Sequence, residues 1–211
     1  MARAAAESAP PKKRRGRKAP PPPPPRKAWW RRHRRAVAVA VALVGLGFSV
    51  RLFVLPPTDV VARADAVVVM PDAGEGGLST ALGLVNAQQA AALVVLGGAE
   101  DPAAQRLCAG EAPVSVLCPP VPADARLRAA AVGALLAEQR WAQVVLVSSR
   151  VHASRDALLV GRCTDAVVLR RLADGDGPAA AAVGAPAELA RYLQALFFRQ
   201  QCAPAAAQVG G

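Results

Sequence analysis

The 211-residue chain has little lysine, histidine or aromatic side chain. No lysine follows Lys27, histidine occurs only at positions 33 and 152, and aromatic residues make up 4% of the chain. With two histidines and no CxxC pair, a zinc site has little support. The scarcity of aromatic rings removes the stacking surface that single-stranded nucleic acids need, and it predicts an aliphatic core.

The formal net charge of +11 belongs to one end of the chain. Residues 1–35 carry a net charge of +12, whereas residues 56–211 carry −2. Because the basicity is confined to a tail, we expect no nucleic-acid partner. Basic blocks and six consecutive prolines predict that residues 1–35 are disordered. Residues 12–35 also suit anionic lipid, although the simpler interpretation is that they only fix membrane topology.

Residues 36–55 form an apolar run that only Arg51 interrupts. As a helix this run would cover about 30 Å, the thickness of the hydrocarbon core of a bilayer. Positive charge stays on the cytoplasmic side, so we expect a single-pass anchor in the cell membrane with residues 56–211 outside the cytoplasm. Two alternatives stay open, a buried core helix and a cleaved signal peptide, for which a 35-residue basic region is long.

After Ala64, short apolar runs alternate with helical patterns. We expect strands at 65–70, 93–96, 114–117, 144–148 and 166–169, and a loop at 71–77. Helices are expected at 79–92, 103–109, 152–163 and 187–201, with a further long helix ending near 139. Strands apolar on both faces are typical of a parallel sheet covered on both sides. The sequence therefore predicts an α/β domain, a Rossmann-like doubly wound parallel sheet of about five strands, after one transmembrane helix.

All four cysteines follow the apolar run, on the side where disulfides persist. Four cysteines allow three pairings. From their places relative to the expected strands and helices we favour Cys108–Cys118 and Cys163–Cys202. The alternative is four buried free thiols.

Ligands of doubly wound sheets bind outside the carboxyl ends of the strands. Glycines beside a helix start let backbone N–H groups approach an anion, although a plain flexible turn explains a glycine loop equally well. We expect two aspartates at this edge, Asp72 and Asp101, to orient an imidazole or to hold a divalent cation between them. The sequence specifies no metal site. The ligand-binding candidates are Asp72, Gly74, Gly76, Gly77, Ser148 and Ser149.

His152 and Arg155 are the catalytic candidates. They lie three residues apart, on one face of the first turn of the expected helix. An imidazole there can act as acid or base, and a guanidinium can clamp a phosphate or carboxylate. The alternative is a helix-start histidine and a surface arginine that pairs with Asp156 or Glu138.

Three stretches, ADAVVVM, LVVLGG and VVLVSSRVHASRDALL, carry a family resemblance. The last is similar to an LVTSxxHxxRA signature, and together they resemble the YdcF/SanA/ElyC group of bacterial envelope proteins over about residues 64–172. The anchor, Arg162-Cys163 and Cys202 are similar to actinobacterial members. The resemblance implies a Rossmann-like domain with a role in envelope or peptidoglycan-precursor metabolism. S-adenosylmethionine binding is associated with one cytoplasmic branch; the sequence specifies no cofactor, substrate or protein partner.

The chain departs from this family pattern at several polar positions. Members usually carry an arginine just after the first glycine loop, where Gly77-Leu78-Ser79 stand here. They usually carry threonine and then asparagine or glutamate where Ala125 and Arg128 stand. Two hypotheses follow: an envelope enzyme acting on an anionic or phosphorylated substrate, and a non-catalytic protein that binds such a ligand or an envelope partner. The charge split disfavours a third, a DNA-associated membrane protein.

Overall fold

The computed structural model describes residues 26–97, 101–110, 114–175, 177–198 and 202. The chain divides into two units, residues 1–41 and 42–211. Helix α1 covers Arg26–Ser49 and continues into a π-helical turn, η1, at Val50–Val54. The expectation of disorder up to residue 35 is therefore wrong for residues 26–35, and residues 1–25 lie outside the described part.

One helix of the described residues, His33–Val54, is long and apolar enough to cross a membrane. Only 11% of its most apolar window is buried, which disfavours the core-helix alternative. The end of the run behaves differently from the rest: Phe53 is completely buried. The last residues of the apolar run therefore belong to the folded domain.

The domain is built on a parallel sheet of five strands in the order β3-β2-β1-β4-β5. This confirms the expected α/β class. Strands β1 and β4 are neighbours although two other strands lie between them in the sequence. The carboxyl ends of these two strands therefore meet at one edge of the sheet. The strands are β1 (Ala64–Val69), β2 (Ala90–Val95), β3 (Ser115–Leu117), β4 (Gln143–Ser148) and β5 (Val167–Leu172).

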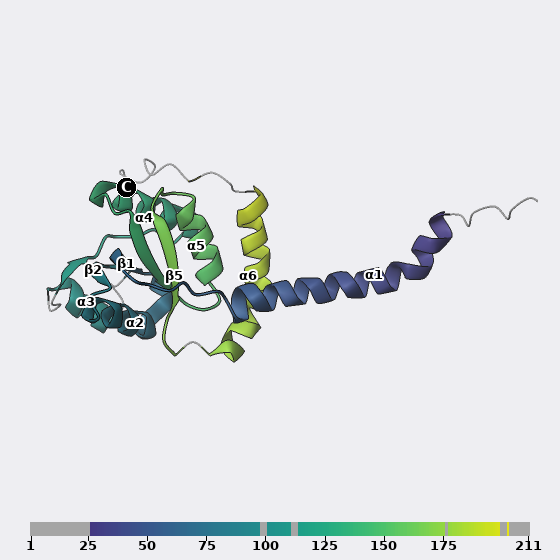
Figure 1. The fold of residues 1–211 in the computed structure, drawn as a ribbon, viewed down its shortest axis with the longest axis horizontal. Helices are drawn as coiled ribbons and strands as arrows, with labels where there is room; N and C mark the ends of the chain where they lie inside the picture. The colour runs from purple at the N-terminus through teal and green to yellow at the C-terminus, as the bar shows by residue number, and fades with distance from the viewer. Residues whose placement is uncertain (1–25, 98–100, 111–113, 176, 199–201, 203–211) are drawn as a thin grey trace, which may run out of the picture. The chain divides into compact units, whose positions relative to one another are not determined.

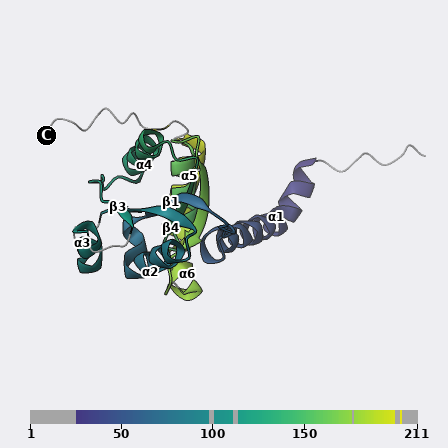
Figure 2. The ribbon, with the colours of Figure 1, turned by 60° about the vertical axis from the view of Figure 1, so that its left-hand side comes forward.

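Helices cover both faces of the sheet (Figure 1, Figure 2). Alternate residues of β1 show the pattern, since Val67 packs with one face and Val68 with the other. One core lies under α2 (Gly74–Asn86) and α3 (Pro102–Cys108). The other lies under α4 (Ala125–Gln139), α5 (Ala153–Gly161) and α6 (Pro178–Phe198). Both cores are aliphatic, as the composition predicts.

The first glycine-rich segment is not a loop as expected. After a short 3-10 turn, η2 (Pro71–Ala73), the chain enters α2 at Gly74, which has a φ of +54°. Residues 74–77 therefore form the first turn of a helix that was expected to begin at Ser79. The helix ends earlier too, so β2 begins at Ala90 and not at Leu93.

Both expected disulfides are present, and the alternative of free thiols is wrong. Cys108–Cys118 joins the end of α3 to the residue after β3. Cys163–Cys202 joins the segment after α5 to the segment after α6 and closes a loop of 39 residues. On the loop-entropy model such a closure contributes about 3–4 kcal/mol.

Two glycines of α2 test how tightly this helix packs. A methyl group at Gly76 would overlap the carbonyl oxygen of Asp174, whereas one at Gly83 would meet nothing within 4 Å. We expect Gly76→Ala to destabilise the domain by about 1–3 kcal/mol, and Gly83→Ala to stabilise it by up to about 1 kcal/mol through helix propensity. Urea unfolding of the full chain in detergent, followed by near-ultraviolet circular dichroism, measures both. Equal stabilities of the two variants would contradict this packing.

Candidate functional site

The neighbouring strands β1 and β4 bring three of the predicted residues together. Asp72 follows β1, Ser148 ends β4, and Ser149 follows β4. Oδ2 of Asp72 accepts hydrogen bonds from Ser149 Oγ at 2.6 Å, from Ser149 N at 3.3 Å and from Ser148 Oγ at 3.3 Å. Its Oδ1 is buried and has no hydrogen-bond partner among the described residues. Asp72 therefore ties the two strand ends together.

His152 lies at the start of α5 and faces a carboxylate from a distant part of the chain. Its Nδ1 is 3.2 Å from Oε1 of Glu188, and the two groups form an ion pair when the imidazole is protonated. Glu188 raises the pKa of His152, burial opposes this rise, and the charge of Asp72 adds to it. A quarter of the His152 side chain is exposed, so the imidazole is within reach of a ligand.

Arg155 does not present an unpaired guanidinium to an anion. Its NH1 donates to both oxygens of Glu188, at 3.0 and 2.9 Å, while Nε and NH2 lie 3.4 and 3.3 Å from Oδ1 of Asp156. The pairing with Asp156 that was left open as the alternative is present. Two carboxylates therefore neutralise the arginine that was expected to clamp a phosphate.

Asp156 is an almost fully buried carboxylate, 2% exposed. Ser148 Oγ donates to its Oδ2 at 2.9 Å. Burial, and after it the nearby charge of Asp72, raises the pKa of Asp156 to about 6, against the opposing effects of Arg155 and Ser148. Asp156 therefore changes its protonation state within the same pH range as a histidine.

Glu188 joins the cluster from α6, and the sequence analysis missed it. It is 1% exposed and contacts three basic side chains: His152, Arg155 and Arg191, the last at 2.6 Å. Burial alone would raise its pKa, but these partners together lower the pKa of Glu188 to about 2. A sequence signal did exist, because Glu188 is the one acidic residue in the 21 residues of α6.

The glycines of α2 pack against backbone and side chains. Gly76 O accepts from Asp174 N at 3.2 Å and from Thr80 Oγ at 2.9 Å, and a side chain at Gly77 would overlap Ala73. Close packing thus explains why these positions are glycine. Ligand binding by Gly74, Gly76 and Gly77 stays a prediction.

Asp101, the other aspartate expected at this edge, serves as a helix cap. Asp101 accepts a hydrogen bond from Ala103 N at the start of α3, and Asp124 caps α4 in the same way. Among the described residues no group of three or more His, Cys, Asp or Glu side chains could hold a metal ion.

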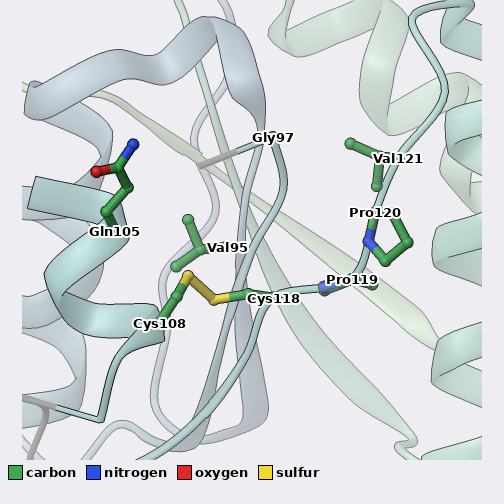
Figure 3. A pocket seen from close by; sticks show the side chains of 8 residues that line it. All are labelled: Val95, Gly97, Gln105, Cys108, Cys118, Pro119, Pro120 and Val121. Carbon is green, nitrogen blue, oxygen red and sulfur yellow. A yellow bond between two sulfur atoms is a disulfide. The ribbon is translucent and has the colours of Figure 1, made fainter. Parts of the chain in front are cut away.

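Two cavities lie near the carboxyl edge of the sheet. One of about 310 Å³ lies between the start of α4 and helices α5 and α6, and three arginines line it: Arg126, Arg155 and Arg191. Another of about 570 Å³ is lined mainly by apolar side chains and by the Cys108–Cys118 disulfide (Figure 3). Only the smaller cavity adjoins the cluster around Glu188, so it is the better candidate for an anionic ligand.

Comparisons of the chain with protein-family models, with curated proteins and with solved structures find no match. The resemblance to YdcF-like proteins therefore rests on the sequence motifs quoted above.

The His152–Glu188 contact predicts a titration shift. In the native chain we expect the pKa of His152 to lie above 6.5. Glu188→Gln removes the charge that raises it but leaves the imidazole buried, so the pKa should fall below that of the native chain. Proton NMR of the imidazole signals, of which the chain has only two sets, measures this. Glu138→Gln, an exposed change on α4, is the control. An equal pKa of His152 in the native chain and in Glu188→Gln would contradict the contact.

From the raised pKa of Asp156 we expect the stability of the folded chain to depend on pH. A pKa of about 6 against an ordinary 3.8 means that the folded state holds the proton more tightly. Stability should therefore fall as pH rises from about 4 to 6, by roughly 3 kcal/mol at 1.36 kcal/mol per pKa unit. Asp156→Asn should remove this fall, as measured by urea unfolding across pH 4–8. Asp165→Asn controls for the loss of an exposed charge. Parallel pH curves for the native chain and Asp156→Asn would rule the effect out.

Proposed function

We propose that this chain is a membrane-anchored, YdcF-like protein of the cell envelope whose outer domain acts on an anionic or phosphorylated substrate. The strand order β3-β2-β1-β4-β5, with helices on both faces, supports a Rossmann-like, doubly wound description. The basic tail, the apolar helix His33–Val54 and the two disulfides support a cytoplasmic N-terminus and an extracytoplasmic domain.

One observation carries the functional part: two arginines that line the cavity, Arg155 and Arg191, also contact Glu188, which faces His152. A phosphate or carboxylate in the cavity would compete with Glu188 for Arg155 and Arg191. His152 would supply the proton as general acid, and Glu188 favours the protonated form by raising the pKa of the imidazole.

A second candidate function, ligand or partner binding without catalysis, is favoured by the internal pairing of the cluster. Arg155 and Glu188 already satisfy one another, and Asp156 is paired with Ser148 and Arg155. A site that neutralises its own charges is stable without a substrate and offers no unpaired nucleophile. The two candidates differ in one respect: catalysis needs the imidazole proton of His152, and binding does not.

Complementation of a strain that lacks this chain separates the candidates. If His152 is the acid, His152→Gln should restore envelope integrity poorly, because loss of a general acid lowers turnover by roughly 10²–10⁴-fold. His33→Gln, a change outside the folded domain at the other histidine, should restore it fully. The measurements are sensitivity to detergent and to cell-wall antibiotics, at matched protein levels.

Full restoration by His152→Gln would favour the non-catalytic function. A deletion strain with no envelope defect would overturn the envelope role itself.

A further inference from the structure

Helix α6 presents an apolar face that no part of the described chain covers. Along this face Val183, Leu193 and Phe197 are 86%, 36% and 63% exposed. Apart from Gln194, the residues between them on the same side are small or apolar as well, and they recur every three to four residues, which is one helix face. They are Ala182, Pro186, Ala187 and Ala190, all exposed. The solvent side of a surface helix is ordinarily polar, so this face calls for a partner.

The opposite face of α6 is fixed firmly to the domain. Ala181, Ala185, Glu188 and Ala195 are buried there. Arg162 donates to the carbonyl oxygens of Ala195 and Leu196 near the end of the helix, at 2.7 and 3.4 Å, and the Cys163–Cys202 disulfide ties down the segment that follows. The exposed apolar face therefore cannot turn inward.

The last residues of the apolar run contact α6. The Phe53 ring packs edge to face on Tyr192, with centroids 5.9 Å apart. The backbone around it is held by α5, since Ser154 Oγ donates to Leu52 O at 2.6 Å and Arg150 donates to Val54 O at 3.2 Å. No linker separates the apolar helix from the domain.

The position of this contact decides which side α6 faces. Val50 is still 37% exposed, whereas Phe53, three residues later, is completely buried beside Tyr192 on the domain side of α6. Helices α5 and α6 are thus the first parts of the domain that the chain contacts. If residues before Val50 lie in the bilayer, α6 lies close to the membrane surface.

We propose that the apolar face of α6 is a lipid-contacting surface, so that α6 lies in the membrane interface beside the anchor. This inference rests on the proposed membrane anchoring. The chemistry of the face suits it: Val183, Leu193 and Phe197 offer side chains that partition into the acyl boundary, and no charged residue interrupts them. Arg191 is 61% exposed at the margin of this face, where a guanidinium can reach lipid phosphates.

The proposal also places the candidate site. Glu188 and Arg191 lie on α6, so the arginine-lined cavity would open beside the headgroup layer. A ligand of this cavity would then be reached from the membrane surface.

Photo-crosslinking to lipid tests the proposal on the full chain. Benzoylphenylalanine is placed singly at Val183, Leu193 or Phe197, and the protein is reconstituted in vesicles of phosphatidylcholine and phosphatidylglycerol. After illumination we expect lipid adducts by mass spectrometry at these positions, several-fold more than at Ser79. Ser79 is the matched control, because it is exposed on α2, which covers the other face of the sheet. An intact Cys163–Cys202 bond in each variant verifies the fold.

A position inside the anchor, Leu43, separates the two proposals, since it is 63% exposed within the apolar helix. Lipid adducts at Leu43 without any on α6 would overturn the α6 proposal and leave the anchor standing. The absence of adducts at Leu43 would overturn the anchor and, with it, the surface proposed on α6. Adducts between two copies of the chain through α6, in place of lipid adducts, would show a dimer interface and overturn the lipid assignment.

Discussion

The carboxylate of Glu188 is the interaction on which the candidate site depends. It is buried and contacts basic groups from two helices, His152 and Arg155 on the α5 side and Arg191 on α6. A buried charge without such partners would cost several kcal/mol, and removing one partner of a buried pair typically costs about 3–5 kcal/mol. Helix α6 is therefore held against α5 by electrostatics as well as by packing, and the place of α6 determines the shape of the arginine-lined cavity.

The cluster also constrains how protons are held at this edge of the sheet. The negative charges of Asp72 and Glu188 balance the positive charges of Arg155 and Arg191. The cluster is therefore neutral when Asp156 and His152 together hold one proton. Burial raises the pKa of Asp156 to about 6, and Glu188 raises the pKa of His152, so both groups hold a proton more tightly than usual. A ligand that brings negative charge to Arg155 or Arg191 would favour a second proton. Binding of an anion and protonation of His152 would thus be linked by charge balance.

Much of the fold could be predicted because buried parallel strands leave uninterrupted apolar runs, and all five expected strands are present. The start of helix α2 was predicted too late in the sequence, because a run of glycines taken by itself indicates a loop. In the structure, Gly76 is required because the backbone of Asp174, almost 100 residues away, packs against it. Asp72 and the two serines could be predicted from topology alone. The contacts of Glu188 with α5 could not, because His152 and Arg155 lie more than 30 residues away from it and alanine-rich helices give no pattern from which a distant partner can be chosen.

The apolar run shows a further limit of composition. Hydropathy assigns residues 36–55 to the membrane as one segment, yet Phe53 is buried by Tyr192 and the carbonyl oxygens of Leu52 and Val54 accept hydrogen bonds from α5. A carbonyl in hydrocarbon finds no donor outside its own helix, so these bonds are evidence that the chain has already entered the domain at Leu52. Because Leu52, Phe53 and Val54 contact α5 and α6, the end of the apolar run is fixed to the two helices that carry Arg155 and Glu188.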